Sequence, residues 1–328
     1  MTSEVVHLTH QYGGGTQKYI DDLIHLFPEL NHEVMNKPPY NFDLKVIKVL
    51  HIHATLVGEG FGWDVLRLVE FFKKKGVRVV LTVHDYQWLF QWCPNPTTEE
   101  LETFQTQDED VKHFKKLVSM CDVVFMHTNN VLRRYEQFCG KLDGITISVP
   151  CDVPVHYERS CIPQVSGKIR IGFLGGNAQH KGFFQFVDLA RKMKCEDLEF
   201  HVYGSDKLKS GELLTSHGKY EDSTINEWFR RDEIHILMAL SLSEETYCYA
   251  LTHMINSGLP IVFLNRGSFR DRLTGLRERF FAVEHLLDLE VKVREAIEYV
   301  RVNQTSSSTA FENEPLKINK KYEKIYVA

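Results

Sequence analysis

The sequence lacks the features that would place it at once in a membrane-spanning or disulfide-bonded class. Its 328 residues include seven cysteines, which is an odd number, and no two of them are spaced as Cys-x-x-Cys. We interpret them as reduced thiols of a cytoplasmic protein, and no charged-then-apolar leader opens the sequence. No apolar run approaches the roughly 18 residues that a membrane-spanning helix needs, so we expect at most peripheral membrane contact.

Positive charge is also scarce, because 39 Lys and Arg face 44 Asp and Glu, for a net charge of -5. Nucleic-acid binding needs a basic surface, and we therefore expect no nucleic-acid partner. The Gly-x-Gly-x-x-Gly fingerprint and the Walker lysine motif are both absent, which argues against an NAD-dependent enzyme and against an ATP-binding loop. The composition, 43% apolar and 25% charged, is that of an ordinary globular protein.

Short apolar, β-branched runs alternate with amphipathic stretches along nearly the whole chain. Several runs are apolar at consecutive positions, as expected for strands of a parallel sheet that is covered on both faces. Repetition of strand, helix and strand predicts parallel sheets with right-handed crossovers. The predicted strands are 5–9, 46–53, 77–84, 123–126 and 145–149 in the first half, and 169–174, 198–203, 234–240, 260–264 and 280–283 in the second.

A segment with two prolines, one glycine and no clean period separates the two halves at 151–168. We therefore predict an α/β protein of two Rossmann-like domains, 1–165 and 166–328, facing a central cleft. A helix is expected at 286–302. The last segment, "LKINKKYEKIYVA", has apolar residues at helical spacing and can pack back onto the first domain.

Each half opens with a strand, a glycine-rich turn and a helix. In the first half the turn holds Gly13, Gly14 and Gly15. Glycines allow a ligand to approach the backbone, and the following helix offers free N–H groups to an anion, although a tight turn alone would also use them. In the second half Gly175 and Gly176 are followed by Lys181 at a helix start, which favours a diphosphate site.

Histidines gather where two neighbouring strands of the first half end. His84 and Asp85 close one strand, and His51 and His53 close the strand before it. His84 could donate a hydrogen bond or shuttle a proton with Asp85 orienting it, or Asp85 could simply cap the next turn. No metal is expected, because no carboxylate or cysteine completes a recognisable ligand spacing. The acidic run 108–110 is interpreted as charge at a helix N-terminus.

The stretch "EETYCYALTHMINSGLP", 244–260, predicts a helix that packs on a sheet and ends at Gly258. Glu245 and His253 sit at unusual places in it, and they either belong to a ligand site or decorate a buried helix.

Taken with its neighbours, this stretch resembles a known family. The segments "GGG", "TVHDYQWLFQWCP", "IGFLGGNAQHKGF", "VYG", "HGKY" and "EETYCYALTHMINSGLPIVFLNRGSFRDRL" are similar, in this order and over nearly the whole chain, to the retaining family-4 glycosyltransferases of the GT-B fold. The similarity is greatest to the polysaccharide-assembly branch, which includes rhamnosyl- and mannosyltransferases.

The resemblance implies transfer of a sugar from a UDP-, GDP- or dTDP-sugar to a hydroxyl of a glycan acceptor, without a metal or other cofactor. It implies catalytic roles for Glu245, His84 and Lys181: Glu245 beside the transferred sugar, His84 on the acceptor side and Lys181 on the diphosphate. The implied donor-binding residues are Gly13, Gly14, Gly15, Gly175, Gly176, Asn177, Tyr203, Gly204, Tyr220, Thr246, Tyr247 and His253.

The sequence departs from the family pattern at two positions. Gly176 replaces an arginine that often accompanies the lysine, so either the positive charge at the diphosphate is lower or Arg266 or Arg270 compensates. His253 replaces the second glutamate of the Glu-x7-Glu signature, which binds the ribose hydroxyls. Two alternatives therefore stay open: a nucleotide-sugar epimerase of the same fold, and a non-catalytic subunit that binds sugar nucleotides or glycans.

Overall fold

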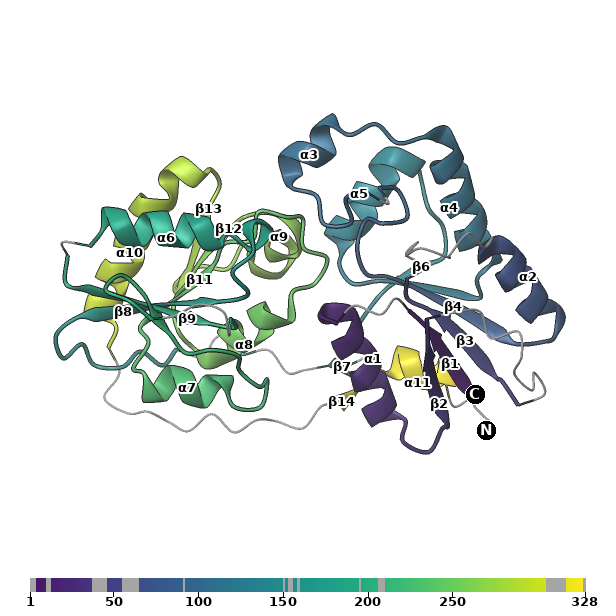
Figure 1. Cartoon of the computed structure of the whole chain (residues 1–328), viewed down its shortest axis with the longest axis horizontal. Coiled ribbons are helices and arrows are strands. Elements are labelled where there is room, and N and C mark those ends of the chain that lie inside the picture. The colour runs from purple at the N-terminus through teal and green to yellow at the C-terminus, as the bar shows by residue number, and fades with distance from the viewer. Residues whose placement is uncertain are drawn as a thin grey trace. The chain divides into compact units, whose positions relative to one another are not determined.

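A computed structural model describes residues 4–9, 13–36, 46–54, 65–90, 92–149, 151–152, 156–157, 160–194, 196–205, 210–304 and 317–326. The chain divides into two compact units, which are described separately. Unit 1 comprises Met1–Val153 with Leu316–Ala328, and unit 2 comprises Pro154–Pro315. Each unit is built on a parallel sheet of six strands flanked by helices, which confirms the predicted α/β class (Figure 1).

The sheet of unit 1 has the strand order β2-β1-β3-β4-β5-β6, and every neighbouring pair is parallel. Chain order along the sheet reverses beside β1, so the first strand lies between the second and the third. Its strands are β1 (Val5–Leu8), β2 (His32–Met35), β3 (Val49–Ile52), β4 (Arg78–Val83), β5 (Val123–Met126) and β6 (Ile145–Ile147).

The two faces of this sheet differ in chemistry. The apolar face packs against α2, α4 and α5 and forms one continuous core. The opposite face carries histidines and is covered by α1 and α11, whose tyrosines reach it. The helices of unit 1 are α1 (Gly15–Leu26), α2 (Val65–Lys74), α3 (Thr98–Thr103), α4 (Asp108–Met120), α5 (Asn129–Cys139) and α11 (Lys320–Tyr326).

The C-terminal segment belongs to unit 1 by direct contact. Strand β14 (Lys317–Ile318) pairs antiparallel with β7 (Cys151–Asp152). In α11, the Tyr322 hydroxyl lies 2.6 Å from the hydroxyl of Tyr19 in α1. Both hydroxyls are buried, so this contact fixes α11 on the histidine face.

The sheet of unit 2 has the order β10-β9-β8-β11-β12-β13, again with parallel pairs throughout. This is the doubly wound order in which the chain changes direction between its first and fourth strands, here β8 and β11. The strands are β8 (Ile169–Leu174), β9 (Leu198–Tyr203), β10 (Thr215–Ser216), β11 (Ile236–Ala239), β12 (Ile261–Leu264) and β13 (Phe280–Val283).

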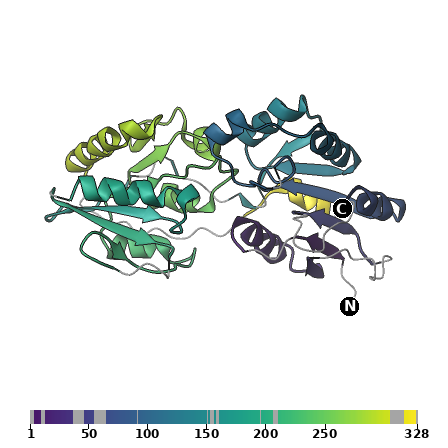
Figure 2. The ribbon, with the colours of Figure 1, turned by 45° about the horizontal axis from the view of Figure 1, so that its top comes forward.

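Both faces of this sheet are apolar and covered. Side chains of α6 and α10 form the core on one face, and those of α7, α8 and α9 form the core on the other (Figures 1 and 2). The helical elements of unit 2 are η1 (Gln179–Lys181), α6 (Phe183–Lys192), α7 (Ile225–Arg231), α8 (Tyr249–Ser257), α9 (Gly267–Leu273), η2 (Leu286–Asp288) and α10 (Leu289–Val302).

All ten predicted strands are present, and so are the helix at the C-terminal segment and the acidic first turn of α4. Four strands were not predicted. Of these, β7, β10 and β14 have two residues each, and β2, "HEVM", has too few apolar residues to stand out. The helix expected over 244–260 begins at Tyr249, because the preceding residues form a turn. No helix within the described ranges is long and apolar enough to cross a bilayer.

Candidate functional site

The polar side chains of unit 2 that carry candidate chemistry lie at the carboxyl edge of its sheet. The loops after β8 and β11 meet there, at the point where the strand order reverses. The Leu242 amide donates to the His180 carbonyl over 2.8 Å, and the Ser241 hydroxyl donates to the same carbonyl over 3.1 Å. Crevices at such switch points are where open α/β sheets bind their ligands.

Gly182 makes this close approach possible. It adopts a left-handed conformation, with φ of 79°, between η1 and α6. A Cβ at this position would lie 1.9 Å from the carbonyl oxygen of Leu240, which no side chain could tolerate. The glycine therefore allows the lysine loop to press against the end of β11.

Lys181 and Glu245 form an ion pair across these two loops, with 2.6 Å between Nζ and Oε1. The Ser241 hydroxyl donates to the same carboxylate oxygen over 2.8 Å. The Lys181 side chain is 37% exposed and the Glu245 side chain 13%, so the cation is the more accessible partner. The structure thus brings together two of the three residues predicted to be catalytic.

Electrostatics keep the Lys181 ammonium charged. Burial lowers the pKa of Lys181, but the negative charge of Glu245 and its hydrogen bond outweigh burial and hold that pKa above its usual value. A charged ammonium and a charged carboxylate at a partly open position can each bind a ligand group of opposite charge or hydrogen-bonding type.

The backbone that follows Glu245 is held by the first turn of α9. Gly267, with φ of 53°, lies so close that a Cβ there would approach the Glu245 amide nitrogen to 2.6 Å. The Ser268 amide donates to the Glu245 carbonyl over 2.7 Å, and its hydroxyl donates to the Tyr247 carbonyl over 2.9 Å. Thr246, between them, is half-buried in the same turn.

Arg272 of α9 secures the end of this turn. Its guanidinium donates to the carbonyls of Tyr247 and Cys248, each over 3.0 Å, and to the Thr252 hydroxyl over 2.7 Å. It also lies over the Tyr247 ring, 4.6 Å from the ring centroid. Cys248, which precedes α8, has a φ of 65°, an uncommon value for a residue with a side chain. The turn is therefore an ordered feature built around Arg272.

Arg266 and Arg270, the candidates to replace the arginine that is missing at position 176, both donate hydrogen bonds to backbone carbonyls. Arg266 donates to the Leu242 carbonyl over 3.3 Å, and Arg270 donates to the Asn265 carbonyl over 3.0 Å. Gly176 itself has open space around its Cα, since an added Cβ would meet nothing within 4 Å. Asn177, next to it, is exposed.

Gly175 and Gly204 pack against each other at the ends of β8 and β9. A Cβ on Gly204, where φ is 112°, would lie 2.9 Å from the Gly175 carbonyl oxygen. The Gly204 amide donates to the Gly218 carbonyl over 2.8 Å. The turns at Gly175, Gly204 and Gly218 thus come close together beside the loop of Lys181, without side chains between them.

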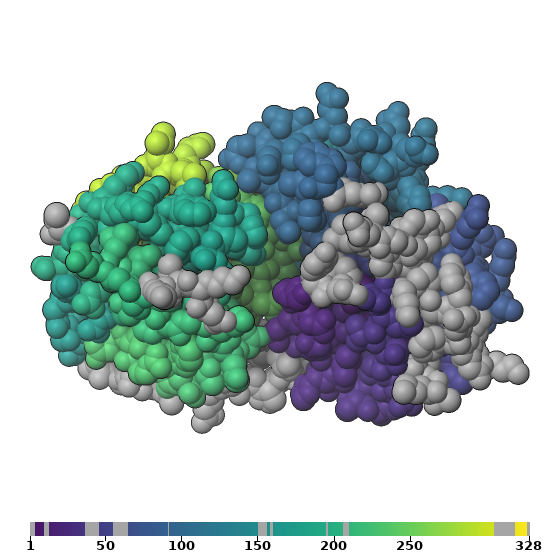
Figure 3. Space-filling view, in the orientation of Figure 1, coloured from purple at the N-terminus to yellow at the C-terminus, as the bar shows by residue number. Residues whose placement is uncertain are grey.

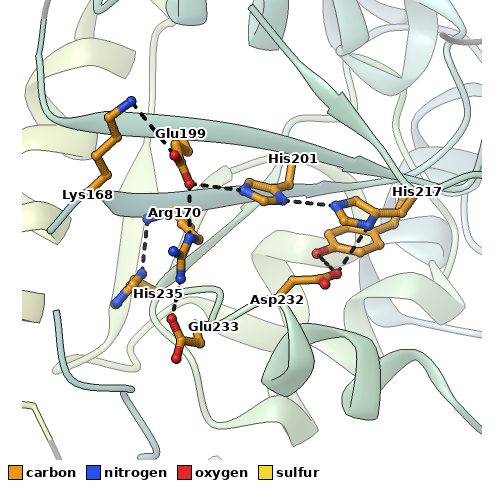
Figure 4. Close-up of polar contacts among 9 residues, drawn as sticks. Lys168, Arg170, Glu199, His201, His217, Asp232, Glu233 and His235 are labelled. Atoms are coloured by element: carbon orange, nitrogen blue, oxygen red, sulfur yellow. Dashed lines mark hydrogen bonds and ion pairs between the residues drawn. The ribbon is translucent and has the colours of Figure 1, made fainter. Parts of the chain in front are cut away.

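Beneath these glycines lies a polar network that Figure 4 shows in detail. The Tyr203 hydroxyl donates to Asp232 over 2.8 Å, and His217 Nδ1 lies 3.2 Å from the same carboxylate oxygen. His217 Nε2 contacts His201 Nδ1 at 2.9 Å. Tyr203 is fully buried, so its hydroxyl serves this network.

His253 pairs with a carboxylate. Its Nε2 lies 3.1 Å from Asp222 Oδ1, and the Tyr220 ring stands edge-on to it at 6.5 Å between centroids. The position of His253 therefore holds an imidazole beside an acid supplied by another segment. Asp222 and Arg272 were not predicted from the sequence, because the spacing of neither residue indicates its partner.

Unit 1 has its own candidate residues at the carboxyl edge of its sheet. Gly13 and Gly14 precede α1 and Gly15 is its first residue; all three are exposed, beside the reversal of strand order. Gly14 has a φ of 91°, and α1 begins at Gly15. Residues 10–12 lie outside the described ranges.

His84, at the end of β4, is buried, and its two nitrogens face other imidazoles: His53 at 3.0 Å and His127 at 3.2 Å. Asp85 accepts a hydrogen bond from the Gln87 amide over 2.9 Å, as expected from the alternative in which it caps the following turn. Burial raises the pKa of Asp85 to about 6.

Comparison with known proteins identifies the fold. No protein-family model matches the chain, and no curated protein does. Among solved structures, the Anabaena protein HepE in complex with UDP and glucose is similar, with 12% identity over 90% of each chain and a TM-score of 0.60. Sucrose-phosphate synthase from Thermosynechococcus elongatus shares 11% identity over 91% of each chain, with a TM-score of 0.58. A glycosyltransferase from Rickettsia africae shares 11% identity over 92% of this chain and 90% of its own, with a TM-score of 0.58. The chain thus has the GT-B fold of glycosyltransferases.

Proposed function

We propose that the protein is a retaining glycosyltransferase that moves a sugar from a nucleoside-diphosphate sugar to a hydroxyl of a glycan acceptor. The observation that carries this proposal is the Lys181–Glu245 pair at the switch point of unit 2. The GT-B fold and the similarity to structures that contain UDP support it. The family-4 resemblance of the sequence supports the retaining outcome and the glycan acceptor.

The diphosphate would bind where Lys181 and two helix N-termini offer positive charge. No side chain caps the N-terminus of α6 or that of α8, and backbone N–H groups at helix N-termini are favourable partners for phosphate oxygens. We propose that these groups and Lys181 neutralise the leaving diphosphate without a divalent metal ion.

Binding would also release Glu245. A diphosphate oxygen that takes Lys181 Nζ breaks the 2.6 Å pair, and the carboxylate can then accept hydrogen bonds from hydroxyls of the transferred sugar. The bond between the anomeric carbon and the phosphate oxygen breaks. The acceptor oxygen bonds to that carbon on the same face, and the departing phosphate takes the acceptor's proton, so no separate base is required.

Calorimetry with UDP, GDP and dTDP and with their sugars tests the proposal. Lys181→Met should weaken nucleoside-diphosphate binding at least about tenfold, because a charge-assisted bond is worth roughly 1.5–3 kcal/mol. Lys192→Met, which removes an exposed lysine from the other end of α6, serves as the control. Equal binding by wild type and Lys181→Met would contradict the assignment.

The variant Glu245→Gln separates binding of the diphosphate from transfer of the sugar. It should keep or strengthen binding of the sugar-free diphosphate, because Lys181 no longer has a carboxylate partner, and it should abolish transfer. Product analysis then distinguishes the alternatives: a new saccharide indicates a transferase, an altered nucleotide sugar without acceptor indicates an epimerase, and binding without turnover indicates a binding subunit.

A further inference from the structure

Two tryptophans of the stretch "QWLFQW", 87–92, have opposite surroundings. Both belong to the loop that leaves the carboxyl end of β4 and leads to α3. Trp88 is buried and packs against Phe114 of α4, with 6.4 Å between the ring centroids. Trp92 is 68% exposed. Trp88 thus belongs to the core of unit 1, whereas burial in that core does not explain Trp92.

The backbone is anchored on both sides of Trp92. The Tyr86 amide donates to the Pro94 carbonyl over 2.9 Å, and the Phe90 amide donates to the Tyr86 carbonyl over 2.9 Å. The Cys93 amide donates to the Phe90 carbonyl over 3.0 Å. A side chain on an anchored backbone loses little further freedom when it binds a ligand, and such preorganisation favours binding.

Other aromatic rings hold the indole of Trp92 in place. Its centroid lies 4.3 Å from that of Phe104, which follows α3, and 6.2 Å from that of Phe90. Phe90 is buried and packs against both Phe104 and Phe138 of α5, each at 5.1 Å. All these pairs are tilted or edge-on, which are favourable geometries for aromatic rings. We call Trp92 and the half-buried Phe104 the aromatic platform.

The chain around the aromatic platform is acidic. Glu100 forms a capping box with Thr97, and burial together with the charge of Glu100 raises the pKa of Cys93, the residue next to Trp92. The Glu100 carboxylate therefore lies within electrostatic reach of the platform. Between positions 92 and 111 the sequence has no lysine or arginine and six carboxylates, those of Glu99, Glu100, Glu102, Asp108, Glu109 and Asp110.

The neighbouring helix α5 does not reverse this balance. It contributes two arginines, Arg133 and Arg134, and one more acid, Glu136. In Figure 3, which keeps the orientation of Figure 1, α3 with its three glutamates is part of the blue surface of unit 1. The platform is therefore an exposed aromatic surface in negatively charged surroundings.

This combination restricts the ligands that suit the platform. Negative charge repels phosphate groups, nucleic acid and anionic lipid headgroups. A pyranose ring is neutral, and the C–H groups on one of its faces can pack against an indole ring. Its hydroxyls can donate hydrogen bonds to carboxylates, which accept only. An exposed tryptophan beside carboxylates thus matches both the apolar face and the polar rim of a sugar.

We propose that the aromatic platform binds a neutral pyranose ring of the glycan acceptor. This proposal rests on the proposed function, which requires such an acceptor, and it adds a binding surface in unit 1. The loop of Trp92 starts at the carboxyl end of a strand, where open α/β sheets carry their ligand-binding loops. Stacking on the platform holds the acceptor and takes no part in breaking or forming bonds.

Two other ligands are known to favour exposed tryptophans. A cation can lie over the indole face, and negative surroundings would strengthen that contact. A bilayer interface also accepts tryptophan, whose ring is apolar at one end and polar at the other. Both are outcomes that a binding experiment separates from a sugar.

Binding can be measured without a donor. In protein labelled with ¹⁵N-tryptophan, the indole signal of Trp92 is assigned from Trp92→Ala. Methyl α-mannopyranoside, maltotriose and lactose are then added in turn at millimolar concentrations. At least one of these neutral sugars should shift the Trp92 signal and leave that of buried Trp88 in place. The absence of a shift with all three sugars would overturn the proposal.

The same spectra test the competing ligands. Tetramethylammonium and vesicles of phosphatidylglycerol should leave the Trp92 signal unchanged. A shift with the cation but with no sugar would assign a cation site instead, and loss of the signal with vesicles alone would assign a membrane contact.

Kinetics test whether the platform serves the acceptor. Trp92→Ala should raise the acceptor KM about fivefold or more and leave kcat and the donor KM within about twofold, because it removes binding that is equal in ground state and transition state. Trp92→Phe keeps an aromatic face and should restore most of the acceptor affinity. Phe184→Ala, which removes a ring of α6 that is 53% exposed, is the control and should change none of these values.

An unchanged acceptor KM in Trp92→Ala would overturn the proposal, and so would a loss confined to kcat. If the wild type transfers no sugar, the proposed function fails, while the indole spectra still decide whether the platform binds a saccharide. The two failures are therefore distinguishable.

Discussion

Acidification should destabilise unit 1 through its buried histidines. Burial lowers the pKa of His7 to about 3 and that of His127 to about 4. In the unfolded chain both groups titrate near the ordinary value of about 6.5. Their folded pKa values lie below the unfolded ones, so the stability they contribute is present above pH 6.5 and is lost as the pH falls toward 4.

The size of the effect follows from proton binding to the unfolded chain. Between pH 7.5 and pH 5.0, each histidine that stays neutral in the folded state costs about 2 kcal/mol of unfolding free energy. Asp85 acts in the opposite direction, because burial raises its pKa to about 6. Its protonation in the folded state therefore adds about 1 kcal/mol to the free energy of unfolding as the pH falls to 5.0. For His7, His127 and Asp85 together the net loss is about 3 kcal/mol, a large share of the roughly 5–15 kcal/mol that stabilises a domain. His51 and His53, whose pKa values burial also lowers well below the usual value, add to this loss.

Urea denaturation followed by hydrogen exchange of unit 1 peptides measures this loss. With a slope of about 2 kcal/mol per molar urea, the midpoint should fall by at least about 1.5 M between pH 7.5 and 5.0. His7→Phe should remove about 2 kcal/mol of the pH dependence, whatever it does to stability at pH 7.5, and His25→Phe should leave the dependence unchanged. A midpoint that moves by less than about 0.5 M, or the same dependence in His7→Phe, would refute the reasoning.

Three further outcomes can be checked in unit 2. Gly182→Ala should destabilise it by more than about 3 kcal/mol in thermal denaturation, because its Cβ would lie 1.9 Å from a carbonyl oxygen, whereas Gly176→Ala should cost less than about 1 kcal/mol. Arg279→Met should cost about 3 kcal/mol, because this buried arginine donates to four backbone carbonyls, and a change below about 1 kcal/mol would contradict that role. His253→Glu alone should not improve UDP binding in calorimetry, because the new carboxylate would face the carboxylate of Asp222. The double variant His253→Glu with Asp222→Asn should bind UDP about tenfold more tightly than His253→Glu, and equal affinities of the two variants would refute this repulsion.

The strands could be predicted because both sheets are covered on two faces, which makes most of their strands continuous apolar runs. The same covering of both faces hid several histidines of the unit 1 sheet. His51 and His53, and His84 with Asp85, stood out at strand ends, whereas His7 stands alone within an apolar strand and His127 stands alone just after one. His32 begins a strand too polar to be noticed. The register that aligns these residues is set by tertiary pairing, and no local pattern encodes it.

The start of α8 shows the opposite case, in which the sequence motif located the site but misjudged its backbone. The residues 244–248 read as the first turn of a helix, because their apolar members continue the period of "YALTHMINS". Packing overrides that period: Gly267 and Arg272, from the next loop and helix, hold the turn by its backbone.

The replacement of a helical turn by this irregular turn changes how the Glu245 carboxylate is held. In the first turn of a helix, the Glu245 backbone would join the helix ladder and its side chain would be fixed by helical geometry. In the observed turn, Ser241 and Lys181 hold the carboxylate instead, and both contacts can be exchanged for ligand groups. Under the proposed function, a diphosphate oxygen that takes Lys181 Nζ separates this pair. Binding of the charged end of the donor is thereby coupled to release of the residue proposed to contact its sugar, so that Lys181 and Glu245 should show strong energetic coupling in a double-mutant cycle on UDP-sugar binding.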